Sequence, residues 1–209
     1  MAIICPTVTA TEPHQFRQQL ERVASFAERI HIDLADGVFT DNKLLPLDDV
    51  WWPAGAFVDV HLMYEAVKPF LAQLVALKPH MVIIHAEAVG NYYSVAKPLK
   101  AVGIKVGVAL LAHTPVTRIK QALPDIDHVL VFSGHLGYFG GKADLELLKK
   151  VEQLKKLHHE IEIGWDGGIN EANAAILAQG GVDVLNVGGA IQRATDPKDA
   201  YGRLKALVS

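Results

Sequence analysis

The stretch RIHIDLAD, residues 29–36, is the clearest guide to the fold of this chain. It is too short and too rich in β-branched residues for a helix, and it reads as a strand of a buried parallel sheet. His31 and Asp33 alternate along it, so both side chains point to the same face. Runs of the same kind recur at residues 2–6, 57–63, 81–87, 105–111, 128–134, 162–168 and 182–189. We therefore expect eight strands.

Amphipathic segments separate these runs and predict helices over residues 13–27, 144–157, 171–181 and from 197 onward. In the first of them, apolar residues recur at a spacing that places them on one helical face. Asn170 is expected to cap the third helix, and Asp196-Pro197 to open the last one with proline in its first turn. The connection over residues 37–56 holds little periodic pattern, so we expect a short or irregular helix there.

Strands that alternate with helices at intervals of roughly 20 to 30 residues predict β/α units and a parallel sheet. Two observations favour a closed (β/α)₈ barrel, the TIM barrel of the α/β class, over an open doubly wound sheet. No G-x-G-x-x-G follows the first strand, and polar residues mark the carboxyl ends of nearly all the strands, where this barrel builds its sites. No linker or low-complexity tract divides the chain, so residues 1–209 are expected to form one barrel domain.

The charge and composition exclude several classes of partner. A net charge of −3 predicts no general attraction to nucleic acid or to anionic membranes, so an anionic ligand must be held by local groups. Cys5 is the only cysteine, which rules out an intrachain disulfide and fits a reducing compartment. The N-terminus lacks the features of a secretory signal, and no apolar run approaches the roughly 18 residues of a membrane span. We expect a cytoplasmic protein without membrane contact, and a homo-oligomer stays open.

Four polar residues stand at strand ends and predict a metal site. His31 and Asp33 lie in the second strand, His61 ends the third and Asp166 ends the seventh. Two imidazoles and two carboxylates form a donor set suited to one divalent ion, such as zinc, iron(II), manganese or cobalt. Each residue alone could be a hydrogen-bonded polar group at a strand terminus, but four at the same barrel end favour the metal.

Two carboxylates beside a metal also suggest a reaction. A proton next to a ketone is removed readily only if the resulting oxyanion is stabilised, which a bound cation does as a Lewis acid. Asp33 and Asp166 could then act in turn, one removing a proton from one face of the carbon and the other returning a proton to the opposite face. The result would be inversion of that carbon, and the two aspartates should titrate as a coupled pair.

Glycine-rich loops predict a phosphate site. Gly167-Gly168 and Gly188-Gly189 follow the seventh and eighth strands, the usual position for phosphate in this fold. Glycine lets backbone N–H groups approach an anion closely. The loop after the sixth strand contains Gly137 and Gly140-Gly141-Lys142, and it could cover the ligand as a lid. Lys142 or backbone amides could then reach the phosphate, although an ordinary flexible loop is an open alternative.

These motifs resemble the ribulose-phosphate 3-epimerases over nearly the whole chain, from Pro6 to Ile191. The resemblance rests on His31-Ile32-Asp33 with Asp36-Gly37 and Phe39, Asp59-Val60-His61-Leu62-Met63, His85 with Glu87, Gly140-Gly141, Asp166-Gly167-Gly168, and Gly188 with Ala190-Ile191. It implies that His31, Asp33, His61 and Asp166 hold the metal. It also implies that Asp33 and Asp166 are the acid/base pair, and that the domain binds ribulose phosphate.

The chain departs from the family pattern around the expected substrate. Thr7 stands where the family usually has serine, and Gly189 stands where the phosphate loop often has serine. Ala35 replaces a methionine, which should enlarge the space around the sugar. The expected lid, residues 135–142, carries an apparent extra residue. We therefore expect the chemistry to be preserved and the substrate fit to be altered.

The resemblance implies an isomerase of carbohydrate metabolism, within the pentose phosphate pathway. The expected reaction is the metal-dependent 3-epimerisation of a ketose phosphate, interconverting D-ribulose 5-phosphate and D-xylulose 5-phosphate by two-aspartate proton transfer through a metal-stabilised enediolate. The expected substrate contacts are Thr7, His61, Gly140, Gly141, Lys142, Gly167, Gly168, Gly188 and Gly189.

Two alternatives stay open: an epimerase of another ketose phosphate, and a non-catalytic paralogue that only binds a phosphosugar. The intact Asp33 and Asp166 argue against the second, because a binding protein needs no opposed acid/base groups. Synthases and decarboxylases of a related phosphate-binding barrel are disfavoured, because no Asp-x-Lys-x-x-Asp pattern lies at the second or third strand.

Overall fold

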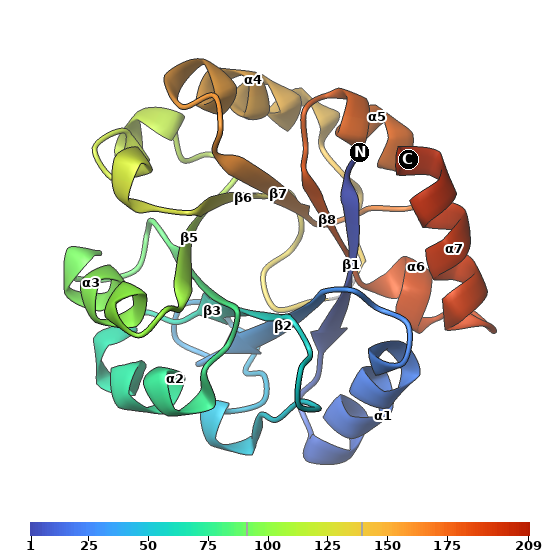
Figure 1. Ribbon diagram of the computed structural model, residues 1–209, viewed down its shortest axis with the longest axis horizontal. Helices are drawn as coiled ribbons and strands as arrows, with labels where there is room; N and C mark the ends of the chain where they lie inside the picture. Colours follow the sequence, from blue (N-terminus) through green and yellow to red (C-terminus); the bar gives the residue numbers. More distant parts are fainter. Residues whose placement is uncertain (91, 139) are drawn as a thin grey trace.

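The computed structural model describes residues 1–90, 92–138 and 140–209. Eight parallel strands close into a barrel in which each pairs with the next and β8 pairs with β1 (Figure 1). The strands are β1 Ile3–Thr9, β2 Ile30–Ala35, β3 Val58–Met63, β4 Met81–His85, β5 Lys105–Leu110, β6 His128–Phe132, β7 Glu162–Asp166 and β8 Val184–Val187. The predicted TIM barrel and its eight strands are confirmed.

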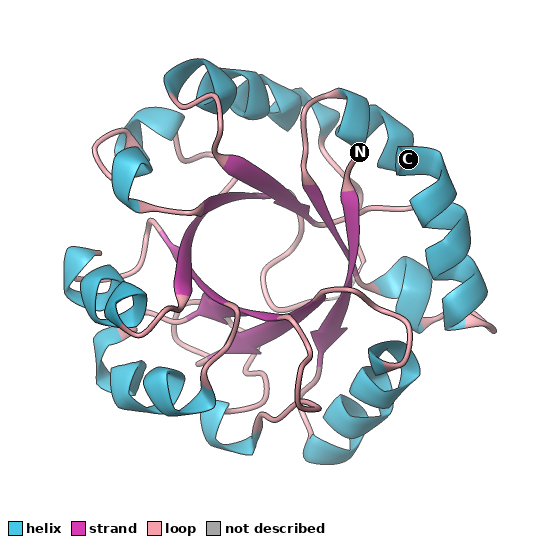
Figure 2. Cartoon of the chain, in the orientation of Figure 1, coloured by secondary structure: helices cyan, strands magenta, loops and turns pink. Residues whose placement is uncertain are grey.

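Helices surround the barrel and cover the outer face of its sheet (Figure 2). They are α1 Pro13–Ala24, α2 Leu71–Leu77, α3 Tyr93–Ala101, α4 Leu148–Leu157, α5 Ala174–Gln179, α6 Gly189–Gln192 and α7 Pro197–Val208. Because helices cover one face of the sheet and side chains fill the other, every residue of β2, β3, β4 and β6 is buried. None of the described helices combines the length and the apolar character needed to cross a membrane.

The helix boundaries follow local capping chemistry. In α1, Phe16, Leu20 and Val23 form the buried face, and in α7 the Asp196 side chain accepts a hydrogen bond from the Asp199 N–H, as an N-cap does. The expected start of the third helix is wrong. The Asn170 side chain accepts from the Ala172 N–H at 2.9 Å and so forms a turn, which delays α5 until Ala174.

Two connections of the described chain replace the α-helix with 3₁₀ turns. The only helical element in residues 37–56 is the 3₁₀ turn Leu47–Asp49, as the weak periodicity predicted. The connection from β5 to β6 was not predicted to be irregular, yet it contains the turns Val116–Ile119 and Leu123–Asp125. Pro115 and Pro124 lie in this connection, and proline removes a helical N–H donor. Further 3₁₀ turns precede α2 and α4, at Lys68–Phe70 and Leu145–Leu147.

The barrel interior is divided into layers. A central apolar layer consists of Met81, Ile83, Ala109 and Leu130. At the amino ends of the strands lies a set of charged and imidazole side chains, here called the floor network: Arg29, Asp59, His80, His128 and Glu162. At the carboxyl ends lies a second polar set, which forms the candidate site described below.

All four carboxylate oxygens of the floor network are paired, whereas His128 Nε2 has no hydrogen-bond partner in the described chain. Arg29 donates from Nε to Asp59 Oδ2 at 2.5 Å and from both terminal nitrogens to the two carboxylate oxygens of Glu162 at 2.9 Å. His128 Nδ1 lies 2.7 Å from Glu162 Oε2, and His80 Nδ1 lies 2.9 Å from Asp59 Oδ1. Each carboxylate therefore has a cationic partner and an imidazole partner, so the strand starts are held together across the barrel.

Gly164 on β7 makes this arrangement sterically possible. A Cβ atom at that position would stand 2.7 Å from Cε1 of His128 and 3.0 Å from Cδ1 of Leu130. Real Cβ atoms do not approach so closely, so the missing side chain provides the space that the His128 ring occupies.

Candidate active site

The four side chains predicted from strand ends converge at the carboxyl end of the barrel. His31 and Asp33 come from β2, His61 from β3 and Asp166 from β7. Asp33 and His61 are direct neighbours in the register of β2 and β3. One donor atom from each of the four residues lies within 4.8 Å of the others, so this group could hold a metal ion. We call it the mouth cluster.

The separations within the mouth cluster fit a small cation. Asp33 Oδ1 lies 2.9 Å from His61 Nδ1 and 3.1 Å from His31 Nε2, and Asp166 Oδ2 lies 3.6 Å and 3.9 Å from His31 Nε2 and His61 Nδ1, respectively. Ligands about 2.0–2.1 Å from a tetrahedral ion stand roughly 3.3 Å apart. Asp166 Oδ2 is buried and has no hydrogen-bond partner in the described chain. A divalent cation would supply the partner that this oxygen lacks.

The two aspartates have opposite acid/base tendencies. Burial opposes ionisation of Asp33, but hydrogen bonds with His31 and His61 outweigh it and hold its pKa below the usual range. For Asp166, burial and then the charge of Asp33 raise the pKa to about 7. Asp33 is therefore the stronger acid of the pair and Asp166 the weaker, as expected for two interacting groups.

Neighbouring side chains orient the cluster. His61 Nε2 lies 2.9 Å from His85 Nε2, and His85 Nδ1 lies 3.4 Å from Glu87 Oε2. Burial, together with the charge of His85, lowers the His61 pKa to about 4, so His61 is neutral and its Nδ1 can donate a lone pair to a metal. The Thr9 hydroxyl donates to Asp33 Oδ2 at 2.8 Å. The resemblance included His85 and Glu87 without a role, and Thr9 was not predicted.

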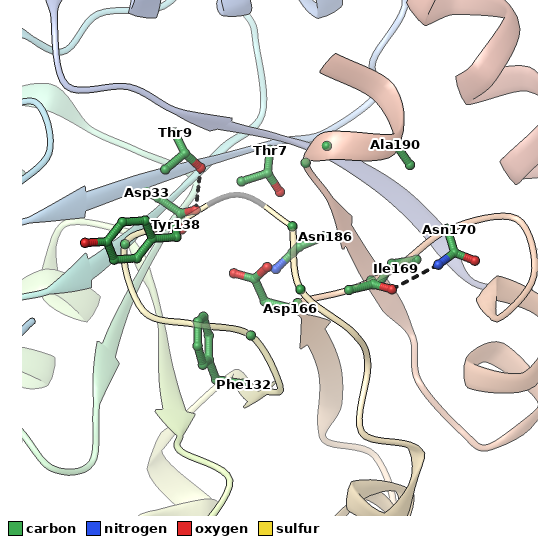
Figure 3. Close-up of a pocket in the computed structure, with 18 of the residues that line it drawn as sticks. Thr7, Thr9, Asp33, Phe132, Tyr138, Asp166, Ile169, Asn170, Asn186 and Ala190 are labelled. Carbon is green, nitrogen blue, oxygen red and sulfur yellow. Dashed lines mark hydrogen bonds between the residues drawn. The ribbon is translucent and has the colours of Figure 1, made fainter. Parts of the chain in front are cut away.

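A cavity of about 310 Å³ opens above the mouth cluster (Figure 3). Asp33 and Asp166 line it together with glycines of the loops after β6, β7 and β8. The predicted substrate contacts that line this cavity are Thr7, Gly140, Gly141, Gly167, Gly168, Gly188 and Gly189. His61 and Lys142 are not part of the lining, and Lys142 is exposed, so their contacts with substrate stay predictions.

The glycines after β7 allow two backbones to touch. A Cβ on Gly168 would meet the backbone of Lys142 and Ala143, and one on Gly167 would meet the backbone of Ser133 and Gly134. Gly167 and Gly168 also have positive φ angles, 111° and 71°, respectively. The loop after β6 therefore lies directly on the loop after β7, which brings two of the glycine segments to the same cavity.

The loop after β6 covers the cavity from one side. Gly137, Tyr138 and Gly140 line the cavity, whereas Phe139 lies outside the described residues. The hydroxyl of Thr40 donates to the Leu136 carbonyl at 3.1 Å, and the Asn42 amide donates to the Gly137 carbonyl at 2.5 Å. The connection after β2 thus holds the loop in the position of a cover, and its movement as a lid stays a prediction.

Arg193 was missed by sequence reasoning. It lies just after α6, and its side chain lines the cavity. A Cβ on Gly189 would stand 3.0 Å from the Nε and 3.1 Å from the Cζ of Arg193, and one on Gly140 would stand 3.1 Å from Nη2. No hydrogen bond or ion pair joins its guanidinium to another described residue. The glycine that replaces the family serine therefore leaves space for a cationic group.

Asn186 and Ala35 also differ from expectation. Asn186, on β8, lines the cavity and was not predicted, because it lies inside an apolar run. Ala35 was expected to enlarge the space around the sugar. It is instead buried against Leu44 and Met63 and is not part of the lining, so its small side chain does not widen the cavity.

Comparison with known proteins agrees with this geometry. The model of the "Ribulose-phosphate 3 epimerase family" matches residues 3–192. The ribulose-phosphate 3-epimerase of Helicobacter pylori is 32% identical over 210 residues, covering 97% of this chain and 96% of its own. That of Bacillus subtilis is 30% identical over 187 residues, covering 86% of each chain. The structure of 3-hexulose-6-phosphate synthase from Salmonella typhimurium is similar in fold, with a TM-score of 0.74 at 16% identity, covering 99% of this chain and 98% of its own.

Proposed function

Because the chain belongs to the ribulose-phosphate 3-epimerase family, we propose that it is a metal-dependent ketose-phosphate 3-epimerase that interconverts D-ribulose 5-phosphate and D-xylulose 5-phosphate. The observation that carries the proposal is the pair Asp33 and Asp166, two carboxylates of opposite acid/base tendency that line one cavity. A site that inverts a carbon needs one group to take a proton and another to give one.

We infer that His31, Asp33, His61 and Asp166 hold one divalent ion, with zinc, iron(II), manganese and cobalt as candidates. The donor set, the separations between its atoms and the unpartnered Asp166 Oδ2 support this inference. When bound, the ion supplies a positive charge that stabilises negative charge on the oxygens of the ketose.

The chain's own groups carry the proton transfer. One aspartate, as the carboxylate, removes the proton from C3, and the electrons pass to the ketone to form an enediolate. The other aspartate, as the acid, returns a proton to C3 from the opposite face. The two residues exchange roles in the reverse direction. Thr9 keeps Asp33 oriented through its hydroxyl.

The other end of the cavity would hold the phosphate. Backbone N–H groups around Gly168, Gly188 and Gly141 can approach an anion closely. Arg193 adds a cation beside them, and it has no competing partner in the described chain. Phosphate recognition here would combine backbone donors with one guanidinium.

The remaining parts of the proposal concern context. We take residues 1–209 as one domain that acts in the cytoplasm on a small sugar phosphate, without a nucleic-acid partner. A homo-oligomer is compatible with it. An epimerase of another ketose phosphate is the second candidate, and it is favoured by Thr7, Gly189 and Arg193, which line the cavity where the family pattern changes or where no cation was predicted.

The proposal is tested by turnover in heavy water. Protein loaded in turn with zinc, iron(II), manganese or cobalt is given ribulose 5-phosphate and a panel of other ketose phosphates. The expected result is xylulose 5-phosphate that carries deuterium at C3. If the product carried no deuterium, proton return by an aspartate that exchanges its proton with solvent would be excluded. Faster turnover of another ketose phosphate would select the second candidate.

A further inference from the structure

Asn186 is a buried amide without a partner. Its residue is 2% exposed, and neither its Nδ2 nor its Oδ1 forms a hydrogen bond with any described residue. Buried polar groups are almost always hydrogen-bonded, because an unpartnered amide loses its interactions with water and gains nothing in return. An orphaned amide in the middle of a strand therefore indicates a site where a ligand completes the hydrogen bonds.

The position of Asn186 shows which part of a ligand it would meet. It lines the cavity, and in the strand register it is the direct neighbour of Asp166 (Figure 3). Gly188, which also lines the cavity, follows two residues later, just after the end of β8. Asn186 thus lies beside one member of the acid/base pair and two residues before a glycine of the proposed phosphate site.

We propose that Asn186 determines substrate specificity by hydrogen-bonding the hydroxyl group on the carbon between the reacting carbon and the phosphate-bearing carbon. The inference rests on the proposed function. For a pentulose 5-phosphate epimerised at C3, this group is the C4 hydroxyl. A hydroxyl both donates and accepts, and an amide offers a donor nitrogen and an acceptor oxygen, so the two groups can satisfy each other.

Thr7 is a second residue of the cavity lining with an unpartnered polar atom. It stands on β1, the other neighbour of β8, and its buried Oγ1 also has no hydrogen-bond partner in the described chain. Two residues of the cavity lining, one on β8 and one on β1, thus carry buried polar atoms without a partner in the described chain. Sites built to bind a hydroxyl reject analogues that lack it, because the protein groups are then left unpaired.

The test compares two substrates in two proteins. The metal-loaded parent and Asn186→Leu, a change of similar size, are assayed with D-ribulose 5-phosphate and with its 4-deoxy analogue by deuterium entry at C3. The parent should prefer the hydroxylated substrate by roughly 10- to 100-fold in kcat/KM. In Asn186→Leu this preference should fall to within about threefold. The melting temperature of the variant should not be lower than that of the parent, because no protein hydrogen bond is removed.

Asn170→Leu is the matched control. Asn170 lines the same cavity, but its side chain already bonds the Gly168 carbonyl and the Ala172 N–H. This variant should melt at a lower temperature and keep the substrate preference.

An Asn186→Leu enzyme that keeps the parental preference would overturn the inference. An equal loss of kcat/KM with both substrates would also overturn it, because it would show that Asn186 acts through Asp166. Absence of turnover by the parent with any ketose phosphate would instead overturn the proposed function, and this inference with it.

Discussion

The mouth cluster and the floor network share strands β3 and β7 and use similar residues, yet their charges are arranged differently. Strand β3 contributes Asp59 to the floor and His61 to the mouth, and β7 contributes Glu162 to the floor and Asp166 to the mouth. In the floor, Arg29 lies between two carboxylates and satisfies both. In the mouth, the partners of Asp33 are two imidazoles and the Thr9 hydroxyl, and Asp166 Oδ2 has no hydrogen bond with a described residue. A polar cluster whose carboxylates are all paired within the protein supports the fold, whereas one with an unpaired carboxylate oxygen is available to a ligand.

The largest expected effect is on activity, and it follows from changing the mouth. Asp33→Asn and Asp166→Asn should each lower kcat by about 10² to 10⁴-fold, because each keeps the side-chain volume but removes the transferable proton. Turnover is measured together with metal content, since both residues are proposed ligands. A variant that keeps its metal but loses turnover supports proton transfer most directly. Near-parental rates in both variants would remove the acid/base assignment.

Changing the floor network should lower the stability of the protein, in contrast to the loss of activity expected from the mouth. Arg29→Met leaves the buried Asp59 and the half-buried Glu162 without their cation, which should lower the free energy of unfolding by about 3–5 kcal/mol. Urea unfolding measures this loss. The control is Arg22→Met, because Arg22 is exposed and among the described residues its side chain bonds only the Ala194 carbonyl; it should stay within about 0.5 kcal/mol of the parent. A loss below about 1 kcal/mol in Arg29→Met would mean that the floor does not stabilise the fold.

Metal should stabilise the protein through the mouth alone. A divalent ion present at 100 times its dissociation constant adds about 2.7 kcal/mol to the free energy of unfolding. Thermal unfolding with and without manganese or zinc should show the increase in the parent and no increase in His31→Gln. An equal increase in that variant would place the metal elsewhere in the molecule.

Arg193 should affect substrate binding more than the chemical step. Arg193→Met is expected to raise KM for the sugar phosphate by roughly 10- to 100-fold, with kcat little changed, because a phosphate contact is similar in the ground and transition states. Lys142→Met is the comparison, since Lys142 was the cation predicted from sequence and is exposed outside the cavity. If Lys142→Met raises KM and Arg193→Met does not, the sequence-based assignment holds and the structural one is wrong.

The smallest expected effect is a pH dependence of the stability that Glu162 of the floor network contributes. Burial raises the Glu162 pKa, but hydrogen bonds with His128 and Arg29 outweigh it and hold that pKa well below its usual range. A folded pKa below the unfolded value, about 4.3, stabilises the protein above that pH, and this stability is lost as the pH falls towards the folded value. The stability difference between the parent and Glu162→Gln should therefore shrink below about pH 4.3. A constant difference would show that Glu162 does not titrate in this range.

The mouth was predictable because its signals are local. His31, Asp33, His61 and Asp166 each stand at or near a strand end that the sequence pattern identifies, and the barrel brings those ends together. The floor was not predicted, because Arg29 and Glu162 are 133 residues apart and no spacing connects them. Asn186 escaped notice for another reason. A single amide within an apolar run looks like an ordinary strand residue until its missing hydrogen bonds are known.

The absent side chain at position 164 also constrains how this barrel can diverge. His128 occupies the space that a methyl group there would need, and that ring is tied to Glu162. Alanine at position 164 is therefore open only to a lineage that has already exchanged the histidine for a smaller residue. If alanine appeared at position 164 first, its methyl group would collide with the His128 ring in the intermediate ancestor. The two positions are thus epistatic, and descendants of this protein should either keep both residues or show the histidine changing first.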